Sequence, residues 1–221
     1  MTRFVILVVA SLALVGHLAN ASEIILRNDA SPAVGKLGSI DAGTRLGVLL
    51  TVPSDGTIVG VKILWGSANG GAAPSQQAAI SISSDTLLNP PNAPLAQILS
   101  PTLIDGGANE FRYLDPGVNS QPLSVPVFAG QILMVDLQYA TSVPNSGPGI
   151  WYDAALQLGK NALYIPNLTP YWVDAQLGSL AGDLGIQAIF QPVPEPGTLT
   201  LVALGMVGVL AVRRARSTKN L

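Results

Sequence analysis

The stretch TIVGVKILWG, residues 57–66, decides the fold class of this chain. Apolar residues occupy every second position, namely Val59, Val61, Ile63 and Trp65. Gly60 and Lys62 fall between them. Successive side chains of a β-strand point to opposite faces, whereas a helix repeats about every 3.6 residues. The period of two therefore predicts a strand with one face in a hydrophobic core.

Further stretches with the same alternation lie on both sides of this one. They are 45–52, 80–83, 110–114, 133–139 and 186–191. Between them stand clusters of Gly, Pro, Asn and Asp, which are typical of turns. Short strands separated by turns predict a mainly β domain, and we expect an antiparallel β-sandwich with a jelly-roll arrangement. A more immunoglobulin-like sandwich is the alternative.

The first 21 residues predict a secretory signal peptide. Arg3 supplies the positive start, residues 4–15 form an apolar run, and the small residues Ala-Asn-Ala at 19–21 form a cleavage site. Cleavage there leaves Ser22 as the first residue. We therefore expect one folded domain outside the cytoplasm, spanning residues 22–191, which is long enough for a substantial core.

The composition of this domain excludes several functions. It carries six cations and twelve carboxylates, a net charge of −6, and no cluster of Lys or Arg for the phosphates of a nucleic acid. The chain has no Cys, and its single His, His17, lies in the signal peptide. Ser-His-Asp and Cys-His mechanisms and conventional zinc or copper sites are therefore excluded. We expect no metal and no cofactor.

Only weak constellations are left for chemistry in the domain. A glycosidase needs two carboxylates at a set separation, but Glu23 and Glu110 are the only glutamates and the aspartates are dispersed, so we expect no catalytic residue. The aromatic pairs are more informative; they are Trp151-Tyr152 and Tyr171-Trp172. Neighbouring residues of a strand point to opposite faces, so one ring of each pair can be exposed and stack on a sugar. The alternative is that these rings fill the core.

The last 30 residues, 192–221, consist of three parts in order. First comes the motif at 193–197, which reads Val193-Pro194-Glu195-Pro196-Gly197. An apolar segment at 198–212 follows, and then a basic tail at 213–221 with Arg213, Arg214 and Arg216. Proline restricts itself and the residue before it to extended conformations, so we expect the motif to be extended. The apolar segment is short for a bilayer core of roughly 30 Å, and the arginines of the basic tail should stay on the cytoplasmic side.

This segment resembles the PEP-CTERM sorting signal of Gram-negative bacteria, which combines Pro-Glu-Pro, a transmembrane stretch and an arginine cluster. The match in order and spacing runs over residues 193–216. The resemblance implies recognition by exosortase, a multi-spanning membrane protease or transpeptidase, in organisms that also produce exopolysaccharide. It implies that the processing enzyme reads Val193, Pro194, Glu195 and Pro196, and it says nothing about the activity of the domain.

We therefore expect a secreted, non-enzymatic protein of the cell surface or of the exopolysaccharide matrix of a biofilm. It is held briefly in the inner membrane by a transmembrane helix, with its domain in the periplasm, and then reaches the cell surface or the medium. The main alternative is a carbohydrate-binding module that uses the aromatic pairs. A glycan hydrolase or lyase that uses aspartate and tyrosine is a further alternative.

Overall fold

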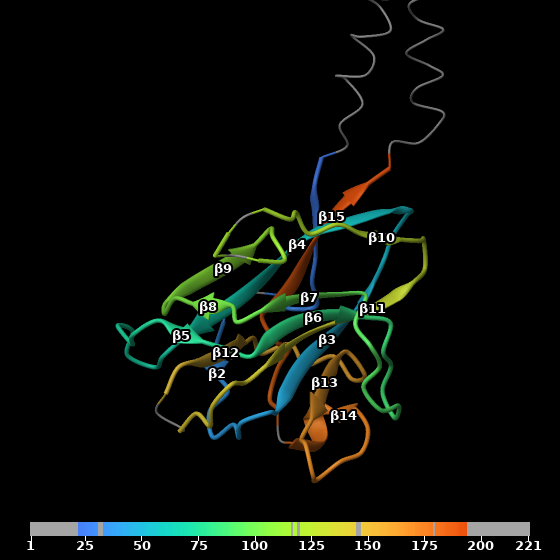
Figure 1. Cartoon of the computed structure of the whole chain (residues 1–221). Coiled ribbons are helices and arrows are strands. Elements are labelled where there is room, and N and C mark those ends of the chain that lie inside the picture. The colour runs from blue at the N-terminus through green and yellow to red at the C-terminus, as the bar shows by residue number, and fades with distance from the viewer. Residues whose placement is uncertain are drawn as a thin grey trace, which may run out of the picture. The chain divides into compact units, whose positions relative to one another are not determined.

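The computed structural model describes residues 22–30, 33–115, 117–118, 120–144, 147–178 and 180–193 (Figure 1). The elements are β1 (Ile24–Leu26), β2 (Gly35–Lys36), β3 (Arg45–Thr51), β4 (Gly56–Gly66), β5 (Ser75–Gln76), β6 (Ala79–Ser83), β7 (Ala96–Leu99), β8 (Thr102–Leu103), β9 (Gly107–Phe111), β10 (Val125–Val127), β11 (Ile132–Gln138), β12 (Gly149–Tyr152), β13 (Asn161–Tyr164), β14 (Val173–Asp174), the 3-10 helix η1 (Ala175–Gly178) and β15 (Ile186–Pro192). The predicted signal peptide at 1–21 and the predicted helix and basic tail at 198–221 lie outside the described residues.

Two large antiparallel sheets hold most of these strands. The larger sheet has the order β1-β15-β4-β12-β2, and β9 and β10 also pair with β4. The smaller sheet has the order β14-β13-β3-β11-β6-β7. Strands β5 and β8 form a separate two-stranded sheet. Figure 1 shows β3, β6 and β11 side by side. The prediction of a mainly β, antiparallel fold is confirmed, and the jelly-roll arrangement stays a prediction.

Inward-facing side chains of both sheets share one hydrophobic core. The larger sheet contributes Val61, Ile63 and Trp65 from β4 and Ile186, Ala188 and Phe190 from β15. The smaller sheet contributes Leu46, Val48 and Leu50 from β3 and Leu133, Val135 and Leu137 from β11. The alternation read from the sequence thus separates core from outer face, because removal of apolar surface from water favours one buried face per strand.

The predicted alternation was wrong in two details. Val59 is only half-buried, and Ile58 is buried in the core instead. The inward-facing positions of β4 are even-numbered at Ile58 and odd-numbered from Val61 onward. This shift of the inward frame occurs where the partner of β4 changes from β10 to β9. The strand predicted at 110–114 is β9, which begins earlier, at Gly107, and ends at Phe111.

A second, smaller cluster covers the outer face of the smaller sheet. It contains Leu49, Met134, Ala162 and Trp172, with Leu87 and Tyr164 packed against it. Leu49 and Met134 face away from the main core, since their neighbours along β3 and β11 are buried there. This cluster covers only part of the outer face, since Leu99 on β7 and Ile132 on β11 are exposed.

Candidate functional site

The sorting motif begins where the described residues end. Val193 follows β15 directly and is 59% exposed. The rest of the motif and the predicted membrane-orienting arginines lie outside the described residues; they are Pro194, Glu195, Pro196, Arg213, Arg214 and Arg216. Within the described part of the chain, no helix has the length and hydrophobicity needed to cross a bilayer.

Trp172 is not available as a platform for a sugar ring. Its side chain is 0% exposed, and its indole nitrogen donates a hydrogen bond to the Asp85 carboxylate at 3.0 Å. Its ring packs against Tyr164, and the Arg45 guanidinium lies over it, 4.9 Å from the ring centroid. The prediction that Trp172 binds carbohydrate is therefore wrong. The indole fills the second cluster, because a Trp with a buried partner for its N–H can be packed at low cost.

The structure does not bring the two aromatic pairs together. Trp151 and Tyr152 belong to β12 of the larger sheet, whereas Trp172 covers the outer face of the smaller sheet. Tyr152 is half-buried and packs against the main core. Tyr171 is 40% exposed next to Trp172. Trp151 and Tyr152 are both half-buried and line a small hollow together, and Trp151 also lines a larger cavity.

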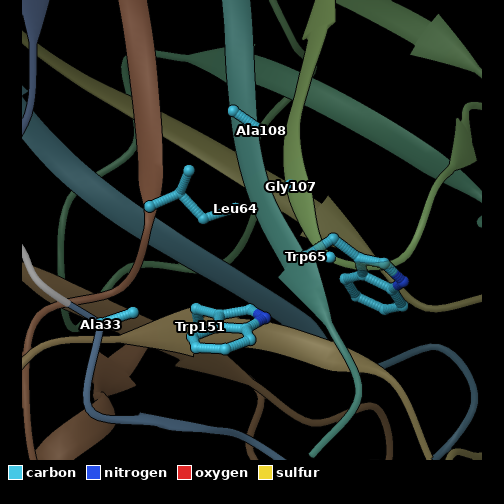
Figure 2. A pocket seen from close by; sticks show the side chains of 7 residues that line it. Ala33, Leu64, Trp65, Gly107, Ala108 and Trp151 are labelled. Carbon is cyan, nitrogen blue, oxygen red and sulfur yellow. The ribbon is translucent and has the colours of Figure 1, made fainter. Parts of the chain in front are cut away.

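Trp151 lines a cavity of about 200 Å³ on the outer face of the larger sheet (Figure 2). Its neighbour Ile150 is in the core, so alternation along β12 turns the Trp151 ring outward. The ring has room because Gly66 has no side chain, and a Cβ at that position would overlap the indole nitrogen. The other lining residues are Ala33, Leu64, Trp65, Gly106, Gly107 and Ala108.

The lining of this cavity is mainly apolar. Leu64 and Ala108 are direct cross-strand partners on β4 and β9, so their side chains lie on the same outer face. Neither residue was predicted from the sequence to belong to a site. Leu64 carries a signal that could have indicated them, since it is an apolar residue at an outward position, two residues after Lys62. A half-buried indole over apolar neighbours can hold the apolar face of a ring-shaped ligand.

A row of ion pairs lies beside the cavity on the same face. The Lys62 ammonium is 3.1 Å from the Glu110 carboxylate, and these two residues are direct partners two positions away from the Leu64–Ala108 pair on β4 and β9. Arg112 donates to Glu110 at 2.5 Å and to both carboxylate oxygens of Glu23 at 2.6 and 2.9 Å. The Arg112 side chain crosses β4 above Gly60, where a Cβ would come within 2.9 Å of it.

These ion pairs bear on the acid–base chemistry of the domain. Hydrogen bonds from Arg112 lower the pKa of both Glu23 and Glu110, and the charge of Lys62 adds to the effect. Both glutamates are therefore ionised at neutral pH. A glycosidase acid must hold a proton near neutral pH, which requires a raised pKa, so neither glutamate suits that role.

Buried aspartates gather at one end of the sheets. Asp153 accepts hydrogen bonds from the backbone N–H groups of Ala30, Ala155 and Asp183. Asp183 accepts from the Asn161 side chain at 2.7 Å and from the backbone and side chain of Gln157. Their oxygens are thus occupied by donors of the chain itself. Among the described residues, no three His, Cys, Asp or Glu side chains are placed to hold a metal ion.

Comparisons with known proteins identify the C-terminal segment and nothing else. No curated protein matches the chain, and no solved structure matches it. The family model of the PEP-CTERM protein-sorting motif matches residues 192–216. The chain therefore carries a PEP-CTERM protein-sorting motif at its C-terminal end, which marks it as an exported protein that an exosortase-type membrane enzyme sorts.

Proposed function

We propose that the chain is a non-enzymatic protein of the cell surface or of the exopolysaccharide matrix, delivered there by an exosortase-type enzyme. The observation that carries this proposal is the match of residues 192–216 to the PEP-CTERM motif. The absence of His and Cys from residues 22–221 and the lowered pKa of both glutamates of the domain support a role other than catalysis.

The proposed route has three steps. Residues 1–21 direct export and are removed after Ala21. The segment 198–212 then inserts briefly, and the arginines of the tail at 213–221 stay in the cytoplasm. The membrane enzyme next cuts near Pro194-Glu195-Pro196, whose extended backbone fits a protease cleft. The domain moves on to the cell surface or the medium, and the tail stays behind.

We also propose that the strands of the two sheets are connected as in a jelly roll.

Intact mass of the protein from the cell surface and the medium tests this route. The expected mass begins at Ser22 and lacks the basic tail. Glu195→Ala should leave a longer precursor in the inner membrane, whereas Glu110→Ala, the same change within the domain, should be processed normally. Mature molecules outside the cell that still contain Arg213 and Arg214 would contradict the proposal.

Carbohydrate binding is the second candidate function, and the cavity beside Trp151 favours it. The half-buried indole lies next to Leu64 and Ala108, and the Lys62–Glu110 pair offers polar groups on the same face. An apolar ring face with polar groups at its edge suits a sugar, which has an apolar ring face and hydroxyl groups around it.

A glycan array with the purified full chain tests this second candidate. Trp151→Ala should abolish glycan binding, and Tyr171→Ala should leave it unchanged, because Tyr171 is exposed but lines none of the described cavities. Binding that survives Trp151→Ala would contradict the assignment. Turnover of the producer's own exopolysaccharide by the wild-type chain would instead support a hydrolase or lyase.

A further inference from the structure

A second hollow, of about 270 Å³, lies where β1 approaches β3, and it shares no lining residue with the Trp151 cavity. The buried side chains of Leu26 and Leu50 contribute its apolar part. Its polar part includes Arg27, Thr51 and Lys160. Two cations from segments far apart in the sequence thus meet at one hollow.

Hydrogen bonds between the surrounding segments fix the shape of this hollow. The Asn28 amide donates to the backbone carbonyls of Leu49 and Lys160, at 3.1 and 3.3 Å. The Gln157 amide donates to the carbonyl of Asn28 at 2.9 Å, and the backbone N–H of Leu49 donates to the carbonyl of Lys160 at 2.8 Å. The segments that carry the two cations are therefore held in place before any ligand binds.

Arg27 and Lys160 differ in their ion pairing from three other cations of the domain. Arg45, Lys62 and Arg112 each form an ion pair. Arg27 and Lys160 form none with any residue in the described ranges. The acid that Arg27 influences is Asp29, which is buried and receives both of its side-chain hydrogen bonds from Gln187. Two cations that form no ion pair within the described ranges are unexpected at one hollow in a domain with a net charge of −6.

We infer that this hollow binds an anionic group, a carboxylate or a sulfate, of an acidic polysaccharide. The guanidinium of Arg27 can donate two parallel hydrogen bonds to such a group, and Lys160 adds a compact charge from the opposite segment. The apolar side chains of Leu26 and Leu50 lower the local polarisability, which strengthens the attraction between charges. The choice of a polysaccharide rests on the proposed surface location, whereas the anion site itself does not.

Binding of matched polymers by the full chain, purified in mild detergent, tests this inference. Dextran and dextran sulfate share a backbone and differ in charge, and polygalacturonate supplies carboxylates. We expect binding of the two charged polymers and none of dextran. Arg27→Ala and Lys160→Ala should each weaken the affinity roughly tenfold, and the double variant should abolish binding. Lys62→Ala removes one positive charge from a residue that does not line the hollow, and it should leave the affinity unchanged.

The controls separate this site from the functions proposed above. Both side chains are outside the hydrogen-bonded frame, so the variants should keep the wild-type near-ultraviolet circular dichroism. Trp151→Ala should not change binding of the charged polymers. Equal loss in Lys62→Ala, or full affinity in the double variant, would overturn the site. Binding of free sulfate alone, with neither polymer bound, would support an anion site and overturn the polysaccharide as its ligand.

Discussion

Asp153 shows how one residue can join several segments of this fold. It is 3% exposed, and its carboxylate accepts hydrogen bonds from three backbone N–H groups, of Ala30, Ala155 and Asp183. Burial by itself raises the pKa of Asp153, but these three donors outweigh it, so the pKa lies below the ordinary value. The carboxylate therefore stabilises the fold in its ionised form.

The first prediction concerns Asp153→Asn, which removes one of the two acceptor oxygens. The free energy of unfolding at pH 7 should fall by about 1–3 kcal/mol, because backbone donors lose a buried partner. A lowered pKa gives stability that is present above the unfolded value of about 4 and is lost as the pH falls through the folded value. Urea unfolding followed by Trp fluorescence should thus show a larger difference from wild type at pH 7 than at pH 3.

Asp41→Asn provides the matched control. Asp41 is exposed, and its side chain makes no hydrogen bond to the residues described by the structure, so the same substitution should change the unfolding free energy by less than about 0.5 kcal/mol. A loss in Asp153→Asn that is as large at pH 3 as at pH 7 would contradict the role of the ionised carboxylate.

At the residue scale the sequence distinguishes poorly between a buried and an exposed aromatic ring. Trp151 and Trp172 both stand next to a tyrosine, and the alternation rule applies to each. The difference depends on partners distant in the sequence. Trp172 is buried because Asp85 accepts its N–H and Arg45 covers its ring, and neither contact has a local signature. The Arg27–Lys160 hollow is missed for the same reason, since its cations are 133 positions apart in the printed sequence.

The strands themselves were largely predictable from the sequence. Their alternation reflects one face in the core and one outside, which is a local pattern. The pairing order was not, because β1 pairs with β15 and β3 lies between β11 and β13, contacts that join distant parts of the chain. The shift of the inward frame within β4 has the same origin, since it occurs where one partner strand replaces another.

Between elements, the pair Arg45–Asp136 joins β3 to β11 on the outer face of the smaller sheet. Arg45 donates two hydrogen bonds of 2.7 Å to the carboxylate, whose side chain is 0% exposed. Burial raises the pKa of Asp136 to about 6 in spite of the hydrogen bonds from Arg45. Burial thus destabilises the ionised carboxylate, and the hydrogen bonds from Arg45 offset this desolvation only in part.

The second prediction is a double-mutant cycle on this pair. Arg45→Met should lower the free energy of unfolding at pH 7 by about 3–5 kcal/mol, because it leaves a buried carboxylate unpaired. Arg45→Met with Asp136→Leu should recover most of that loss, since no charge is then buried. The loss in Arg45→Met should be smaller at pH 5, below the raised pKa, where Asp136 is protonated. Equal losses in the single and double variants, measured by urea unfolding, would contradict this account.

On the scale of the whole molecule, the two ends of the domain lie on neighbouring strands. Residues 23–191 form one compact unit. Ile24 on β1 is the direct partner of Phe190 on β15, so Glu23 lies across from Gln191. Adjacent strands are about 4.8 Å apart, so the point that follows the predicted signal-peptide cleavage is close to the point where the sorting segment begins. Removal of both segments should therefore leave the sheets intact.

The third prediction uses this proximity in a circular permutant. A linker of about four Gly and Ser residues joins Gln191 to Glu23, and the chain is opened between Gly70 and Gly71. Both glycines have positive φ angles and no other atom near the position of a Cβ, so the loop tip should tolerate new ends. The permutant should keep the near-ultraviolet circular dichroism of the linear chain 22–193 and unfold at a urea concentration close to that of the linear chain.

A second permutant decides whether the result depends on the loop or only on the linker. Opening the chain between Val135 and Asp136 cuts β11, which pairs with both β3 and β6. Loss of either pairing exposes Val135 and its neighbours in the core, so this permutant should not fold. If the loop permutant also fails, then the two ends do not lie together in the folded domain, and the pairing of β1 with β15 is wrong. If both permutants fold, an unbroken β11 is not needed for folding, and β11 would not be an essential part of the hydrophobic core.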